Sequence, residues 1–448
     1  MSLLQHVASE TANPIARKRA ELKAAGLELI DLTDSNPTRH ELFDPRILDI
    51  IADHLPQAGR YDPNPRGPWP ARAALAERFG GGPEDYWLTA STSEAYGWLF
   101  SLLADPGDTV AIPAPGYPLI EPLARLHHVK TRAYRTFYMH PSGWELDRPS
   151  LEAIIATPGT RAVVAVNPNN PTGAYTESDL VDAVAQAGLP LIADEVFFPF
   201  RLADSGAAGP PCEDDHRGQR RTEGAPDADL PLVGFAPAAT CPTDPSPAHP
   251  SPADPSPAHS SPASTRQTDT SPPASRLAGT ESTLTFGLDG LSKLLAAPQL
   301  KLGWIRLSGP RAQQARAEQA LDEIADSYLS VNSPVALALP DLLTLADSTI
   351  VRVTDRLRRN LATARTIFPD FRIRTVYGGW MMVLDVPPIM EADALGVALM
   401  ERAGLYAHPG YFYDLPDSAL TISLLPRPDV FEQSCHLLLA ALTVFMNE

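Results

Sequence analysis

The stretch Arg161-Ala-Val-Val-Ala-Val-Asn-Pro-Asn-Asn-Pro-Thr-Gly173 joins a short apolar run to a turn rich in asparagine and proline. An apolar run bounded by turn residues is typical of a strand buried on both faces. A helical pattern follows at 177–188. Strand, turn and helix predict one unit of an α/β fold, with Asn170 at the carboxyl end of a strand, where ligands bind in such sheets. Alone, the turn is equally typical of an ordinary loop.

Strand and helix patterns alternate along most of the chain, as expected for helices packed on a mostly parallel sheet. Further buried strands are predicted at 109–112, 190–193, 282–286 and 304–307, and a further helix at 310–328. A later region, about 345–448, has its own alternating pattern, with strands near 380–384 and 420–424. The predicted fold is α/β, with a large, mostly parallel sheet sandwiched by helices and a smaller C-terminal α/β domain.

A tract from about Ala203 to Ser282 differs in composition from the rest of the chain. Pro, Ala, Ser, Thr, Asp and His dominate it, and a ten-residue unit at 244–253 is repeated almost verbatim at 254–263. Many prolines and little apolar area predict a segment that does not pack and is disordered or polyproline-like. The predicted organisation is an arm that joins the small domain (1–40), a large domain (41–330, interrupted by 203–282) and a small domain (331–448).

Composition opposes several classes of function. A formal net charge of −18 and a pI near 5.0 disfavour binding to nucleic acid or to an anionic membrane surface. The N-terminus does not resemble a signal peptide, and no run reaches the roughly 18 apolar residues of a membrane span. The three cysteines form no close pair, and His249 and His259 are too far apart to predict a metal site. We therefore expect a cytoplasmic protein that binds small molecules and contains no metal.

Two residues with reactive side chains follow predicted strands. Asp194 comes directly after the strand at 190–193, and Lys293 ends Gly290-Leu-Ser-Lys293 after the strand at 282–286. Burial would lower the pKa of Lys293 toward the neutral amine that attacks carbonyl carbons. Taken singly, each has a structural reading: a surface lysine, or an acid that only supports a strand end.

Anion-binding features lie on either side of these residues. Thr92 and Ser93 precede an apolar helix at 96–103, and hydroxyl residues at a helix N-terminus offer donors to an anion. Lys301, eight residues after Lys293, is a cation placed for a phosphate group. The structural alternative for the first feature is ordinary helix capping.

The order of these features resembles that of the class I/II aminotransferases, which are fold type I enzymes that depend on pyridoxal phosphate (PLP). The resemblance covers about residues 25–445 apart from the tract, and it implies a fold type I PLP-dependent transferase. It rests on the hydroxyl-rich helix start, Pro115-Gly116-Tyr117, the Asn-Pro-Thr-Gly turn, Asp194-Glu195 and Ser292-Lys293 with a cation eight residues later.

The resemblance implies a role for each matching residue. The lysine matching Lys293 carries PLP as an aldimine and then shuttles a proton. Asp194 matches the acid that keeps the pyridine nitrogen protonated. Asn170 matches the residue that binds the phenolic oxygen, and Tyr117 the ring that stacks on the pyridine. The implied phosphate site consists of Thr92, Ser93, Ser292 and Lys301, with Lys301 in the place of the usual arginine.

Three positions depart from the family pattern. Phe197 stands where many relatives have a tyrosine that donates to the phenolic oxygen. The absence of this hydrogen bond is expected to raise the pKa of the aldimine. Gly290 stands where a phosphate-binding serine is common. Thr421 stands where an arginine holds the α-carboxylate of the substrate bidentately. The alternatives for this last role are Arg427, Arg17, Arg39 and the main chain near Asn36.

Tyr61, in Arg60-Tyr-Asp-Pro-Asn-Pro-Arg-Gly67, matches a tyrosine that reaches the cofactor phosphate of a neighbouring subunit. This match implies a homodimer with shared active sites. The structural reading is an aromatic residue beside a turn.

The implied activity moves an amino group between an L-amino acid and a 2-oxo acid. A PLP-dependent carbon–sulfur β-lyase of the cystathionine β-lyase type stays open, because the same carbanion at Cα can expel a β-substituent. A PLP-sensing regulatory module is disfavoured, because such proteins need a basic DNA-binding domain and only about 25 residues precede the matching region.

Overall fold

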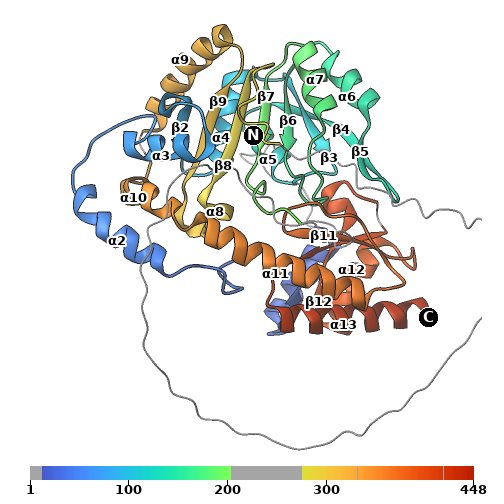
Figure 1. Cartoon of the computed structure of the whole chain (residues 1–448). Helices are drawn as coiled ribbons and strands as arrows, with labels where there is room; N and C mark the ends of the chain where they lie inside the picture. Colours follow the sequence, from blue (N-terminus) through green and yellow to red (C-terminus); the bar gives the residue numbers. More distant parts are fainter. Residues whose placement is uncertain (1–12, 203–274, 330, 417) are drawn as a thin grey trace, which may run out of the picture. The chain divides into compact units, whose positions relative to one another are not determined.

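An eight-stranded sheet is the largest element of the computed structural model, which describes residues 13–202, 275–329, 331–416 and 418–448 (Figure 1). The strand pairs β8–β7, β7–β6, β6–β3 and β3–β4 are parallel. Strand β9 is antiparallel to its neighbours β2 and β8, and β5 is antiparallel to β4. The predicted large, mostly parallel sheet is confirmed. Across the sheet the strands are β2 (Tyr86–Thr89), β9 (Gly303–Ser308), β8 (Thr285–Gly290), β7 (Leu191–Asp194), β6 (Thr160–Val166), β3 (Thr109–Ala114), β4 (Lys130–Met139) and β5 (Gly143–Leu146).

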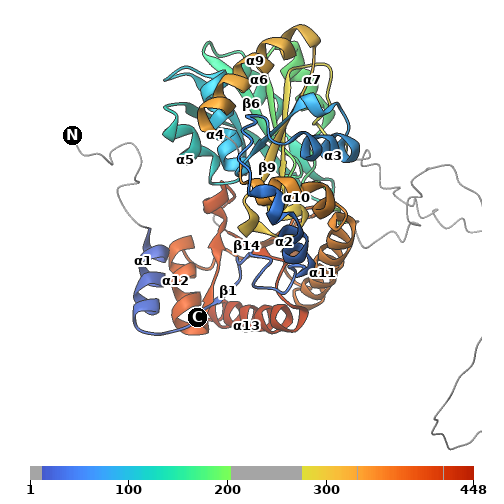
Figure 2. The same ribbon diagram turned by 90° about the vertical axis from the view of Figure 1, so that its left-hand side faces the viewer.

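Different helices cover the two faces of this sheet, because side chains alternate along each strand. In β6, Val164 packs in one cluster and Val163 in another, on the opposite face. Since both faces are buried, the strand reads as a continuous apolar run. Figures 1 and 2 show the helices around the strands. One face is covered by α4 (Thr92–Leu103), α5 (Ile120–Leu126) and α9 (Arg311–Tyr328), and the other by α6 (Arg148–Ile155) and α7 (Ser178–Gln186), with α2 (Arg46–Ala58), α3 (Trp69–Phe79) and α10 (Ser333–Leu343) beside β2 and β9.

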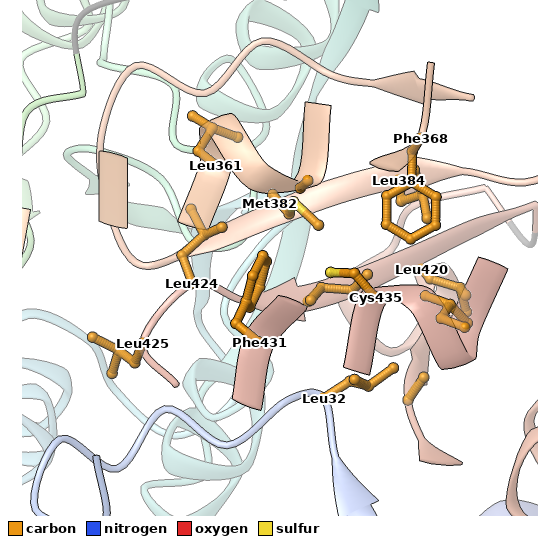
Figure 3. Close-up of a cluster of buried hydrophobic side chains, with 14 of the residues drawn as sticks. Leu32, Leu361, Phe368, Met382, Leu384, Leu420, Leu424, Leu425, Phe431 and Cys435 are labelled. Carbon is orange, nitrogen blue, oxygen red and sulfur yellow. The ribbon is translucent and has the colours of Figure 1, made fainter. Parts of the chain in front are cut away.

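A second, antiparallel sheet lies in the C-terminal part of the chain. Its four strands are β10 (Arg372–Ile373), β11 (Met381–Asp385), β14 (Ala419–Ser423) and β13 (His408–Pro409). The sheet packs on α11 (Ala346–Ile367) and α13 (Pro428–Met446), and Figure 3 shows Phe431 and Cys435 of α13 among Met382, Leu384 and Leu420. The length and composition of α13 are those of a membrane-spanning helix, but its apolar side chains contribute to this core.

The described N-terminal segment joins this second region. β1 (Ile30–Asp31) pairs in parallel with β12 (Leu405–Tyr406), and α1 (Pro14–Ala24) packs on α12 (Ala392–Ala403), as Figure 2 shows. The described residues group as one unit, so the boundaries at 40/41 and 330/331 stay predictions.

The tract at 203–282 is described only at its end, since residues 203–274 lie outside the described residues. The expectation that the tract does not pack is wrong for residues 275–282. Leu277 is 5% exposed and packs with residues of α7 and β7. Arg276 forms ion pairs with two buried carboxylates. A single leucine beside a single arginine has no periodicity, so composition could not separate these residues from the tract.

Candidate active site

The predicted site residues gather where five strands reach one edge of the large sheet. β3, β6, β7 and β8 end there because they are parallel. β2 also ends there, since two successive antiparallel pairings through β9 give it the direction of β8. A cavity of about 490 Å³ opens at this edge. Of the predicted residues, its walls contain Thr92, Tyr117, Asn170, Asp194, Ser292 and Lys293.

Lys293 lies in α8 (Leu291–Leu294), the short helix that follows β8. Its Nζ is 4.8 Å from the ring centre of Trp380 and 5.3 Å from that of Phe197. Burial lowers the pKa of Lys293 to about 8; Asp194 opposes this shift and Lys301 adds to it. A usable fraction of the amine is therefore neutral and nucleophilic near pH 7.

Asp194 ends β7 and is 5% exposed. Its carboxylate accepts hydrogen bonds from the Tyr96 hydroxyl (3.1 Å) and the Val196 N–H (3.3 Å). Burial raises the pKa of Asp194 to about 6, while these hydrogen bonds and Lys293 lower it. Sequence reasoning missed Tyr96, although its position four residues after Thr92 places both residues on one face of α4.

The N-terminus of α4 begins at the cavity wall with Thr92. The side chain of Ser91 caps the helix by accepting the Glu94 N–H at 3.1 Å. Amide groups without a partner inside the helix and the positive end of the helix dipole make this terminus an anion site. Ser93 and Lys301 do not line the cavity, so their phosphate roles stay predictions.

The loops that carry Tyr117 and Asn170 are bonded to each other. The side-chain amide of Asn169 donates to the Pro115 carbonyl oxygen at 3.0 Å. The turn also depends on Gly173, which has a φ of +70°. A Cβ at this position would lie 2.5 Å from a backbone oxygen, so only glycine fits.

Two departures from the family pattern have a physical reason in the packing. Phe197 packs edge-on against Trp380, with ring centres 5.4 Å apart, and forms an apolar wall beside Lys293. Gly290 has no room for a side chain, because a Cβ would lie 3.0 Å from the Leu302 carbonyl oxygen. A serine at position 290 would therefore require β9 to move.

Two of the predicted substrate residues, Thr421 and Arg427, lie outside the cavity walls. Thr421 is fully buried in β14. Arg427 is half exposed, and its guanidinium group pairs with Asp429 at 2.9 Å and Glu41 at 3.2 Å. Its charge is thus already engaged at the surface.

Asn36 also lies outside the walls, although its neighbour Ser35 lines the cavity. The exposed residues Arg17 and Arg39 do not line it either. Tyr61 is 71% exposed and does not reach the cavity of its own chain.

Sequence reasoning missed a whole wall of the cavity. It comes from the second sheet and the segments around it, which carry no motif at a strand end. Its residues are Trp380, Met381, His408 and Tyr413.

Comparison with known proteins identifies the family. Residues 59–215 match the model for aminotransferases of class I and II. This region of the chain belongs to the class I and II aminotransferase family. Among the relatives of the chain, alanine aminotransferase of Mycobacterium tuberculosis is 33% identical over 207 residues, 43% of this chain and 47% of the relative. Glutamate-pyruvate aminotransferase AlaA of Escherichia coli is 30% identical over 207 residues, 44% of this chain and 50% of the relative. The match thus spans half the length of these relatives or less.

Solved structures show the same fold over nearly the whole chain. An aminotransferase from Escherichia coli superposes with a TM-score of 0.72 at 20% identity, covering 99% of this chain and 98% of its own. Alanine aminotransferase from Pyrococcus furiosus gives 0.73 at 18% identity, covering 98% and 100%. The predicted fold type I architecture is confirmed.

Proposed function

We propose that this protein is a PLP-dependent aminotransferase that moves an amino group between an L-amino acid and a 2-oxo acid. The arrangement of Lys293, Asp194 and Asn170 around one cavity carries the proposal. The family match and the aminotransferases among its relatives support it.

The cavity walls fit PLP by their chemistry. Asp194 is a buried carboxylate whose pKa is raised by burial, and a protonated ring nitrogen would supply the cation that stabilises its charge. Lys293 would hold the cofactor covalently, and the N-terminus of α4 at Thr92 would hold the phosphate. Tyr117 would stack on the ring, and Asn170 would bind its phenolic oxygen. Bound PLP supplies a carbonyl carbon for amines and a ring that withdraws electrons from the Cα of the substrate.

In this proposal Lys293 has two tasks. Its neutral amine acts as the nucleophile, and it later carries the proton of the substrate Cα. Its Nζ lies beside the rings of Phe197 and Trp380, and burial lowers its pKa to about 8, which keeps the amine a usable base near neutral pH.

Loading of the cofactor-free protein with PLP is expected to accelerate as pH rises toward 8. Only the neutral amine attacks, and the pKa of Lys293 lies at about 8 instead of the usual 10.5. The rate should increase roughly tenfold from pH 6 to pH 7 and level off above pH 8. Stopped-flow absorbance of PLP measures it. A rate that keeps rising to a midpoint near 10.5, the usual value for lysine, would contradict the buried amine.

The function is tested with the PLP-loaded protein and single L-amino acids, without an acceptor. The visible PLP absorbance should convert to that of pyridoxamine phosphate, and a 2-oxo acid should restore it. The β-lyase alternative is assayed as pyruvate released from cystathionine or an S-alkylcysteine. Strong pyruvate release without spectral conversion would replace the aminotransferase with the lyase.

We also infer a homodimer in which Tyr61 completes the site of the partner subunit. The high exposure of Tyr61, away from the cavity of its own chain, supports this inference. Tyr61→Ala and Lys293→Ala should each be nearly inactive alone, whereas a mixture that exchanges subunits should regain about a quarter of wild-type activity. Each mixed dimer then contains one site with both residues. If Tyr61 served its own subunit, mixing would restore nothing.

We further infer a cytoplasmic location. The unpaired thiol of buried Cys435 is compatible with a reducing compartment. Cell fractionation with an antibody to the protein tests this.

A further inference from the structure

One wall of the cavity is a row of hydrogen-bonded side chains. His408 in β13 and Tyr413 in the turn Gly410–Tyr413 line the cavity. The Nδ1 atom of His408 lies 3.0 Å from the Tyr413 hydroxyl, and its Nε2 atom lies 3.0 Å from the Tyr406 hydroxyl. The Thr421 hydroxyl donates to the His408 carbonyl oxygen at 3.4 Å. We call these four residues the polar row.

The polar row is uncharged near neutral pH. Burial lowers the pKa of His408 to about 4; Asp31 opposes this shift and Arg19 adds to it. Burial raises the pKa of Tyr413 to about 12. Arg19 and Asp31 pair with each other at 2.7 Å. The polar row therefore offers hydrogen bonds to a ligand without an ionic contact.

A neutral imidazole has one N–H and one lone pair. When the hydrogen is on Nδ1, His408 donates to the Tyr413 oxygen and accepts from Tyr406. The hydrogen of Tyr413 is then left to donate into the cavity. The Gly116 N–H donates to the Tyr413 carbonyl oxygen at 3.1 Å, and Tyr117 and Tyr413 line the same cavity, so this donor lies beside the expected ring site.

We propose that Tyr413, oriented by His408, recognises the carboxylate of the amino acid substrate through a hydrogen bond from its neutral phenol. The proposal rests on the aminotransferase function and deepens it. Thr421, where the family pattern has arginine, is the register partner of His408 between β13 and β14, and its hydroxyl donates to the His408 carbonyl oxygen. The tyrosine–histidine pair thus lies directly beside the position of the usual carboxylate clamp. His408 is a positioning residue, because it acts through Tyr413.

A single hydrogen bond from a neutral phenol binds a carboxylate more weakly than a bidentate guanidinium group does. The polar row should therefore favour an L-amino acid over its decarboxylated amine by about 10- to 150-fold, the range for a hydrogen bond to a charged group. Two matched pairs of probes measure this preference: L-alanine with ethylamine, and L-phenylalanine with 2-phenylethylamine.

The test uses the full-length protein loaded with PLP, and records the spectral conversion by each probe in a single turnover. Tyr413→Phe should raise the apparent dissociation constant of the amino acids by about 10- to 150-fold. It should leave the maximal rate and the affinity for the amines unchanged. Tyr411→Phe is the matched control, because its hydroxyl bonds to Asp393 at 2.6 Å and it does not line the cavity.

The positioning role of His408 is tested with two substitutions. His408→Ala should reproduce the weaker amino acid binding of Tyr413→Phe. His408→Asn keeps an N–H near the place of Nδ1, so it should restore most of the affinity. Equal behaviour of the two variants would show that His408 does not orient Tyr413.

Unchanged amino acid binding in Tyr413→Phe would overturn the proposal, as would a wild-type preference for the amines. Isothermal titration with 3-phenylpropionate, which has a carboxylate but no amino group, distinguishes failure of the carboxylate role of Tyr413 from failure of the aminotransferase function. If this probe binds wild type more tightly than Tyr413→Phe while no amino acid is transaminated, the aminotransferase function fails and the carboxylate role stands. If the probe binds both equally, Tyr413 does not recognise carboxylates.

Discussion

Lys293→Ala is expected to remove the visible absorbance of protein-bound PLP and to lower transaminase activity by roughly 10³-fold or more. The substitution removes both the nucleophile and the group that carries the proton, and no other lysine lines the described cavity. Absorbance spectra of the purified protein after incubation with PLP, followed by gel filtration, measure the first effect. Single-turnover conversion with L-amino acids measures the second.

The control for this variant is Lys130→Ala, at an exposed position that begins β4. It should keep the visible band and the activity. If Lys293→Ala also kept its band after gel filtration, the covalent role of Lys293 would be refuted, and the cavity would hold its ligand by other contacts.

Arg276→Gln is expected to cause a large loss of stability. Its Nη1 atom lies 3.2 Å from Asp289 and 3.4 Å from Glu195, two carboxylates that are almost fully buried. Glutamine leaves both without a cation. Because the Arg276 side chain is 22% exposed, we expect a loss of about 2–3 kcal/mol in the free energy of unfolding, below the range for fully buried pairs.

This loss should depend on pH. Burial raises the pKa of Asp289 to about 7, and Arg276 opposes the shift, so the pKa rises further in the variant. A carboxyl group with a raised folded pKa loses stability as pH increases from its usual value of 3.8 toward the folded value. At pH 5 Asp289 is protonated in the wild type and in the variant. At pH 8 the wild type pairs the Asp289 charge with Arg276, whereas the variant must either bury that charge without a cation or keep the carboxyl protonated. Urea unfolding should therefore show a larger difference at pH 8 than at pH 5.

Arg402→Gln provides the comparison, because Arg402 pairs with Glu448 at an exposed site. Its loss should be much smaller than that of Arg276→Gln at both pH values, because water screens an exposed ion pair. Losses of equal size for the two variants would show that the buried carboxylates do not depend on Arg276.

Asn170 and Asp194 follow continuous apolar runs, whereas Lys293 follows a mixed run at 282–286. Parallel strands that are buried on both faces produce apolar runs, and their carboxyl ends meet at one edge. Local patterns therefore predicted the sheet and these strand ends, and the family resemblance implied the role of each residue.

The rest of the cavity depends on pairing between distant segments. His408 lies in a two-residue strand, too short to show a period, and reaches the cavity through its pairing with β14. Tyr413 follows in a turn with no signal of its own. The family resemblance identified Thr421 as the missing arginine, but the hydroxyl and imidazole groups around it come from tertiary structure. Arg276 was hidden for another reason, since it lies in a stretch whose composition resembles the neighbouring tract.

The chain on either side of residues 203–274 is fixed by contacts of its own. The Leu202 N–H donates to the Tyr377 carbonyl oxygen at 2.8 Å, and the Leu202 side chain is buried. On the other side, Arg276 and Leu277 are held by buried carboxylates and by packing on α7. Strands β7 and β8, which carry Asp194 and lead to Lys293, are thus anchored independently of what joins them. We therefore expect the connection to tolerate changes in length and sequence, and it is a site at which new chain termini or a reporter domain could be introduced.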